Sequence, residues 1–182
     1  CTMLNNPGLI RRERVQIVVN EEVSLEAFVF SRRHSASPID CSSGTTDTRT
    51  RPAGVVVVPP HPKLGGDAYN NVVVQVADDI AQAGHLALTV NLRGVGRSTG
   101  QSTWRGIEEA GDVRACVNYL KNKAQINEVF LCGYSYGAAI SGPVAAAMPM
   151  VAGWIAISYP CGWIPSLLLG CHRIEELEKS QL

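Results

Sequence analysis

The sequence predicts a three-layer α/β fold with a mainly parallel sheet and an antiparallel hairpin at its N-terminus. An unbroken β-branched run at residues 54–59 is typical of a strand buried on both faces of a parallel sheet. Strand and helix patterns alternate after this run, which favours helices packed on both faces of one sheet. Two earlier strand patterns are joined by a short polar turn, as in a hairpin.

Residues 14–19 and 24–30 are the two predicted strands of this hairpin, and the second alternates apolar and polar side chains. Residues 32–52 then change to Ser, Thr, Asp, Arg and Pro, with almost no large apolar side chain. This composition favours a flexible insertion loop inside one domain that spans residues 1–182. His34 and Cys41 are interpreted as residues of a solvated loop.

The middle of the chain continues the alternation. A helix is predicted over residues 67–83 from the spacing of its apolar residues, with Asp67 capping its start and Gly84 ending it. A strand over 86–90 and a loop over 91–100 follow. The loop contains Gly-x-Gly, but no third glycine and no helix start follow at the spacing of a dinucleotide-binding site, so nucleotide binding is not expected.

The next predicted helix covers residues 104–123. Its apolar stripe is formed by Ile107, Ala110, Val113, Val117 and Leu120. Its acidic residues are interpreted as a solvated face rather than a metal site: Glu108, Glu109 and Asp112. A strand near residue 130, a helix of small residues over 136–147 and a strand over 152–158 complete the pattern.

Composition restricts the possible partners. With 182 residues, 46% of them hydrophobic, and a formal net charge of zero, the chain has the character of an ordinary globular domain. Its basic residues are spread along the sequence, so nucleic acid is not an expected partner. No apolar run approaches the ~18 residues of a membrane span, and no signal peptide is recognisable. We therefore expect a cytoplasmic protein.

The cysteines show no Cys-x-x-Cys pair and no spacing typical of metal ligands. They are Cys1, Cys41, Cys116, Cys132, Cys161 and Cys171. Three of them lie in apolar segments, where a thiol packs as a small hydrophobic group. Free thiols are favoured over disulfides, and no metal or organic cofactor is expected.

One motif carries chemistry, namely Gly-x-Ser-x-Gly at residues 133–137, which follows a strand pattern and precedes small, helix-tolerant residues. This is the context of a nucleophile elbow, in which a sharp turn lifts a serine hydroxyl out of the sheet. Ser135 is therefore the predicted nucleophile. It would lie at a helix N-terminus, where the backbone N–H of Tyr136 is a predicted oxyanion donor.

A second oxyanion donor is expected in the loop after the strand at 54–59. Because Pro62 has no N–H, the donor would be the backbone of Lys63 or Leu64. His61, in the same loop, is interpreted as a residue that orients the loop rather than as a catalytic base.

Three motifs in this order resemble the α/β-hydrolase superfamily, in particular soluble serine hydrolases related to serine aminopeptidases. They are His61-Pro62 with Gly65-Gly66, Arg93-Gly94-Val95-Gly96-Arg97-Ser98, and Gly133-Tyr134-Ser135-Tyr136-Gly137. The likeness covers about residues 14–172. It implies hydrolysis of a small-molecule ester, thioester or amide through an acyl-enzyme on Ser135, and structural roles for Arg93 and Ser98.

The resemblance is incomplete at the C-terminal end. In the superfamily an acid and then a histidine follow the nucleophile, after two further strands, and residues 159–182 supply no such strands. His172 follows Ser135, but it precedes its nearest acids, Glu175 and Glu176. We therefore expect an incomplete domain whose catalytic acid and histidine are missing from this chain. The alternative is a non-catalytic relative that binds a ligand, or a partner at an exposed sheet edge.

Overall fold

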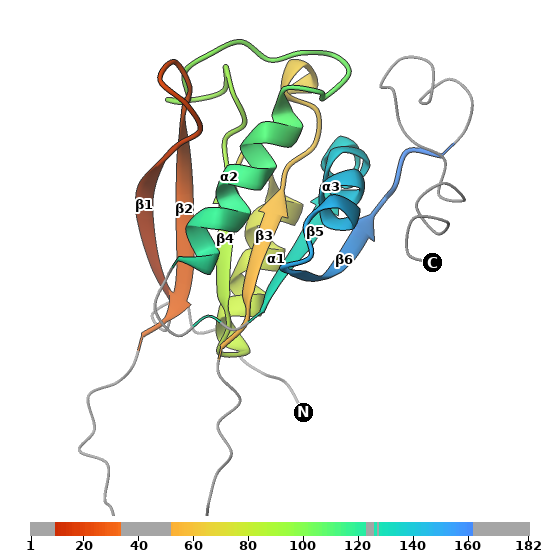
Figure 1. The fold of residues 1–182 in the computed structure, drawn as a ribbon. Helices are drawn as coiled ribbons and strands as arrows, with labels where there is room; N and C mark the ends of the chain where they lie inside the picture. The colour runs from red at the N-terminus through yellow and green to blue at the C-terminus, as the bar shows by residue number, and fades with distance from the viewer. Residues whose placement is uncertain (1–9, 34–51, 123–125, 127, 162–182) are drawn as a thin grey trace, which may run out of the picture.

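The computed structural model describes residues 10–33, 52–122, 126 and 128–161, and these form one six-stranded sheet with helices on both faces (Figure 1). The strands are β1 (Ile10–Val18), β2 (Ser24–Arg32), β3 (Gly54–Val58), β4 (Leu86–Val90), β5 (Val129–Tyr134) and β6 (Val151–Ile157). The helices are α1 (Asn71–Gln82), α2 (Glu109–Lys121), α3 (Tyr136–Ala147) and the short 3-10 helix η2 (Pro62–Leu64). Most of the predicted insertion at 32–52 lies outside the described residues.

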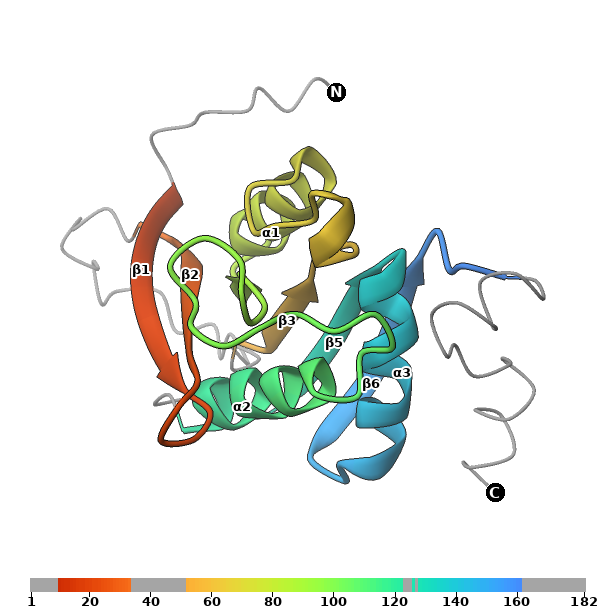
Figure 2. The same ribbon diagram turned by 90° about the horizontal axis from the view of Figure 1, so that it is seen from above.

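The strands are ordered β1-β2-β4-β3-β5-β6 across the sheet. β1 and β2 form an antiparallel hairpin, β2 pairs antiparallel with β4, and β4, β3, β5 and β6 run parallel. Figure 2 shows α1 on one face of the sheet and α2 with α3 on the other. The predicted three-layer fold with an N-terminal hairpin is confirmed.

Each face of the sheet has its own apolar cluster. Under α1, Val73, Ala77 and Ala81 pack with the strand residues Phe30 and Val57. Under α2 and α3 the cluster contains Val113, Val117, Leu120, Ile140 and Val144, together with Val56, Val58, Leu88 and Leu131 of the strands. All five residues of β3 are buried, because helices cover both faces at the centre of the sheet.

Helix α1 begins later than the sequence predicts. Its N-cap is Asn70, whose Oδ1 accepts a hydrogen bond from the backbone N–H of Val72 at 3.0 Å. Asp67 instead caps the preceding turn, since its Oδ1 accepts from the N–H of Tyr69 at 2.9 Å. Gly84, at φ +91°, follows the last turn, as expected of a glycine that ends a helix.

Helix α2 also begins later, at Glu109 rather than near residue 104. Gly106 has φ +75°, a backbone angle that right-handed helices do not contain, and Ile107 is 74% exposed. The predicted solvated acidic face is wrong for two of its three residues, because Glu109 and Asp112 are completely buried. They belong to the stripe that faces the sheet.

Of the cysteines, Cys116, Cys132 and Cys161 are free thiols, while Cys1, Cys41 and Cys171 lie outside the described residues. Within the described part, no group of three or more His, Cys, Asp or Glu side chains is placed to hold a metal ion. No helix among these residues has the length and apolar character needed to cross a membrane.

Candidate active site

Ser135 lies in a strained turn between β5 and α3. Its backbone angles are φ 55° and ψ −119°, which a residue with a side chain rarely adopts. Hydrogen bonds hold this conformation: the Ser135 N–H donates to the carbonyl of Ile157 at 2.8 Å, and the Ser135 carbonyl accepts from the N–H of Ala138 at 2.9 Å. The sequence motif therefore forms the sharp strand-to-helix turn that it predicts.

Two glycines allow this turn to pack against its neighbours. A Cβ atom on Gly133 would meet the backbone of Ala138, and one on Gly137 would meet the carbonyl oxygens of Val58 and Pro59. Only a residue without a side chain permits these backbone approaches. The start of α3 thus lies directly against the end of β3, which leads into the His61 loop.

The His61 side chain connects three segments around the elbow. Its Nδ1 accepts a hydrogen bond from the Lys63 N–H at 3.1 Å, and its Nε2 lies 3.3 Å from the carbonyl oxygen of Trp104. The imidazole centroid is 4.3 Å from that of the Tyr136 ring and 4.9 Å from that of Trp104. This pattern requires a neutral imidazole with its proton on Nε2.

The three predicted oxyanion donors lie around this histidine. The Lys63 N–H donates to His61 Nδ1, and the Leu64 N–H donates to the His61 carbonyl at 3.0 Å. Tyr136 is the first residue of α3, and its ring is in contact with the imidazole. The sheet topology therefore brings Ser135, Tyr136 and the Lys63 turn to one region; their catalytic roles stay predictions.

His61 is expected to make stability depend on pH. Burial lowers its pKa from the ordinary value of 6.5, and the bond to Trp104 only partly opposes this effect. The folded protein therefore binds a proton less readily than the unfolded chain, so the free energy of unfolding should fall as the pH drops below about 6.5. Urea unfolding between pH 8 and 5 measures this slope. A slope that His61→Gln leaves unchanged would contradict the assignment to His61.

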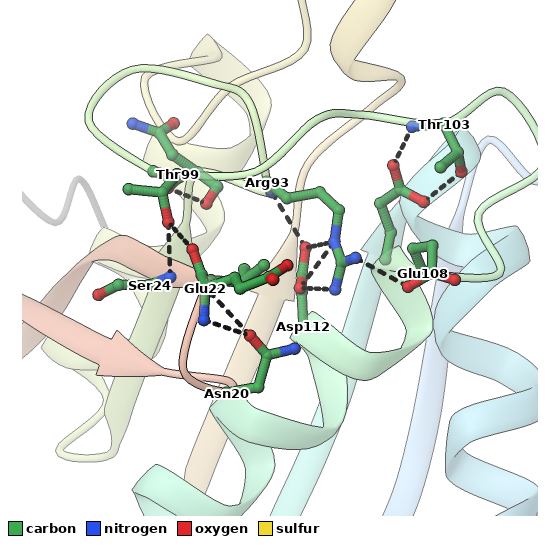
Figure 3. A network of polar contacts seen from close by, with 12 residues as sticks. Asn20, Glu22, Ser24, Arg93, Thr99, Thr103, Glu108 and Asp112 are labelled. Atoms are coloured by element: carbon green, nitrogen blue, oxygen red, sulfur yellow. Dashed lines mark hydrogen bonds and ion pairs between the residues drawn. The ribbon is translucent and has the colours of Figure 1, made fainter.

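A buried ion pair anchors the loop after β4 to helix α2 (Figure 3). Arg93 is 7% exposed, and its guanidinium lies 2.7 Å from Asp112 and 2.9 Å from Glu108. Asp112 also accepts a hydrogen bond from the Arg93 backbone N–H at 3.0 Å. The hydrogen bond to Asp112 raises the pKa of Arg93 above its ordinary value, so the guanidinium remains charged.

The neighbouring acid, Glu109, holds the loop that precedes α2. Its carboxylate accepts from the backbone N–H of Thr103 at 2.5 Å and from the Thr103 hydroxyl at 2.6 Å. These bonds bind the Thr103–Glu109 loop back onto the start of the helix, which explains why α2 does not extend to Trp104.

A second buried carboxylate, Glu26 of β2, organises the loop at residues 91–98. It accepts hydrogen bonds from the Asn91 side chain at 2.9 Å and from the Arg97 backbone N–H at 3.2 Å. The Ser98 hydroxyl donates to the Asn91 carbonyl at 2.6 Å and accepts from the Glu26 N–H. Gly96, at φ +57°, leaves room for the Asn91 and Glu26 side chains. Arg93 and Ser98 therefore have the structural roles that were expected.

The burial of these acids was not predicted, although the sequence carries a signal for two of them. Val113, Cys116 and Leu120 lie on the buried stripe of α2. Extending that stripe backward by three or four residues reaches Glu109 and Asp112. Glu26 gave no such signal, because in a strand of alternating residues a carboxylate is expected to face solvent.

The two described histidines are not placed as a base for Ser135. Both ring nitrogens of His61 have partners, as given above. His85 precedes β4, and its Nδ1 accepts from the Ala53 N–H beside the start of β3, at the opposite end of the strands from the elbow. His34 and His172 lie outside the described residues.

Comparison with known proteins places this geometry in a family. A sequence profile described as serine aminopeptidase, S33, matches residues 54–177. An uncharacterised protein of Rickettsia prowazekii is 31% identical over 110 residues, which are 60% of this chain and 46% of that protein.

Two solved structures are similar over most of the chain. One is an α/β serine hydrolase homologue from Coxiella burnetii, with 27% sequence identity and a TM-score of 0.63. The match covers 81% of this chain and 63% of that protein's chain. The other is an α/β serine hydrolase without a lid from Xanthomonas campestris, with 25% sequence identity and a TM-score of 0.67. Here the match covers 84% of this chain and 64% of that protein's chain. The chain thus spans less than two thirds of each of these relatives. The family profile covers more than half of this chain, and the chain belongs to the serine aminopeptidase family of α/β hydrolases.

Proposed function

We propose that this protein is a serine hydrolase that cleaves a small-molecule ester, thioester or amide through an acyl-enzyme on Ser135. The observation that carries the proposal is the backbone of Ser135, a non-glycine residue held at φ 55° between a strand and a helix. Strain of this kind costs about 1–3 kcal/mol and persists where surrounding structure enforces it, often at catalytic residues. Membership of a hydrolase family supports the same interpretation.

In this proposal the Ser135 hydroxyl attacks the substrate carbonyl carbon, and its proton passes to a base. The carbonyl oxygen becomes an oxyanion, which the backbone N–H of Tyr136 stabilises at the start of α3. Collapse of this intermediate expels the alcohol, thiol or amine, which takes the proton from the base, and leaves an acyl group on Ser135. Water then attacks the acyl-enzyme, and the carboxylic acid leaves.

The second oxyanion donor is assigned to Lys63 rather than to Leu64. The Leu64 N–H is bound to a backbone carbonyl that helps to form the η2 turn. The Lys63 N–H donates instead to Nδ1 of His61, a side-chain acceptor. The same N–H can therefore turn partly toward a substrate oxygen without breaking the backbone turn. In this role His61 positions the donor and takes no proton.

The base and the acid are assigned to residues outside the described part. In α/β hydrolases both follow the nucleophile along the chain, the acid before the histidine. An oxyanion hole without a base retains only about 10³–10⁴-fold catalysis over water, so an activated Ser135 requires such a base.

A fluorophosphonate probe with intact-mass detection tests the proposal. In a protein that includes this base, we expect one adduct per chain, on Ser135, and no adduct in Ser135→Ala, which has no hydroxyl to react. Ser31→Ala is the matched control, because Ser31 lies in β2, which two other strands of the sheet separate from β5. It should label like the wild type.

Two results would contradict the proposal. Labelling that persists in Ser135→Ala would move the nucleophile to another residue. A natively folded protein that contains such a base and still does not label would show that Ser135 is not activated, and would favour a non-catalytic relative that binds a ligand or a partner.

A further inference from the structure

The open edge of the sheet at β1 borders two cavities. β1 pairs with β2 on one side only, so within the described residues its other edge has no strand partner. Residues 14–16 line a cavity of about 320 Å³, and residues 16–19 line one of about 500 Å³. The two cavities share Gln16.

The residues that line the cavities show where the cavities lie relative to the strand. Side chains alternate between the two faces of a strand, so a cavity confined to one face contacts every second residue. Here each cavity is lined by consecutive residues of the chain, 14–16 in one case and 16–19 in the other. Val18 is among them although it is 71% exposed. The cavities therefore reach the strand edge, where the backbone is accessible to a partner.

The smaller cavity carries positive charge. Its charged lining residues are Arg14, Glu26 and Arg97. The Glu26 carboxylate is buried, already accepts two N–H groups, and lies 3.8 Å from the Arg14 guanidinium. Arg97 is exposed, and its guanidinium has no ion-pair partner among the described residues. Two guanidinium groups thus face one carboxylate.

The larger cavity lies between β1 and α2. Its helix wall includes the small residues Gly111 and Ala115, which leave room for incoming side chains, and the amides Asn118 and Asn122. Arg114 is its charged residue, and no acidic side chain lines it. Both cavities therefore favour an anionic partner.

We propose that the edge of β1 binds an extended acidic segment of another protein as an added strand. Residues 14–18 of β1 form about 17 Å of strand, enough for several backbone hydrogen bonds with a partner strand. Alternate side chains of that segment enter the two cavities, and its carboxylates pair with Arg97 on one face and Arg114 on the other. This inference does not depend on Ser135.

Charge argues for an acidic partner and against a second copy of this chain. β1 contains Arg11, Arg12 and Arg14 but only one acidic residue, Glu13. Pairing of two β1 strands would bring these arginines together, and like charges on opposed strands are destabilising. An acidic strand instead neutralises them.

The test uses a fluorescein-labelled, end-capped octapeptide of alternating valine and glutamate and measures fluorescence anisotropy with the whole chain. We expect saturable binding with a Kd of about 10–100 μM that weakens as salt is added. Replacing glutamate by lysine in the peptide should abolish binding, and so should N-methylation of alternate peptide amides. Hydrogen exchange should slow in residues 10–18.

Protein variants locate the binding site. Arg97→Glu and Arg114→Glu should each weaken binding about tenfold or more, whereas Arg105→Glu, an exposed arginine outside both cavities, should not. The proposal is overturned if the peptide does not bind at 1 mM. It is equally overturned if the N-methylated peptide binds as tightly, or if Arg105→Glu has the same effect as the other two variants.

Discussion

Replacing Asp112 by alanine is expected to lower the free energy of unfolding by about 3 kcal/mol or more. The change would leave the Arg93 guanidinium, only 7% exposed, with Glu108 as its remaining ion-pair partner among the described residues. It would also remove the acceptor of the Arg93 backbone N–H. A buried charge or N–H without a partner is costly, because the water that solvates it in the unfolded chain is not replaced.

Two variants separate this effect from a general loss of charge. Glu108→Ala removes the partner whose side chain is 61% exposed, and should cost at most about 1 kcal/mol. Asp112→Asn keeps an oxygen that can accept from Arg93, so its cost should lie between the two. Urea unfolding midpoints with unchanged m-values measure all three. Equal losses in Asp112→Ala and Glu108→Ala would show that burial of the pair is not the decisive factor.

The fold could be predicted because its signals are local. A β-branched run marks the central strand, and Asn20 shows how a short polar turn closes the hairpin: its Oδ1 accepts from the N–H groups of Glu22 and Val23. The Gly-x-Ser-x-Gly motif likewise specifies both the elbow and the helix after it, whose bounds were predicted correctly. In each case the residues that determine the structure are neighbours in sequence.

The polar interior could not be predicted because its partners are distant in sequence. Glu26 contacts Asn91 and Arg97, which lie 65 and 71 residues away in the sequence. Arg93 and Asp112, which also contact each other, are 19 residues apart. From sequence alone each carboxylate on an amphipathic element resembles a solvated residue. Only the topology, which brings the loop after β4 against β2 and α2, shows that these acids are buried and paired. The same topology places the His61 ring between Tyr136 and Trp104.

The second large effect is expected for Gly137→Ala, which should reduce the rate of fluorophosphonate labelling at Ser135 about 10²-fold and destabilise the fold by about 1–3 kcal/mol. The new methyl group would meet the carbonyl oxygens of Val58 and Pro59, which are backbone atoms of the central strand and its exit. Because these atoms cannot rotate away as a side chain would, α3 must shift. The Tyr136 N–H and the Ser135 hydroxyl would shift with it.

Gly111→Ala is the matched control, because it places the same methyl group in another helix. There the nearest atom is the Arg93 guanidinium at 3.7 Å, an ordinary van der Waals contact, and alanine should stabilise α2 by about 0.5–1 kcal/mol. Ser135→Ala supplies the complementary case, since it should abolish labelling and leave the unfolding midpoint almost unchanged. A defect in the position of the elbow is expected to change both measurements together. If Gly137→Ala lowered stability but labelled at the wild-type rate, contact between α3 and the end of β3 would not be what positions the nucleophile.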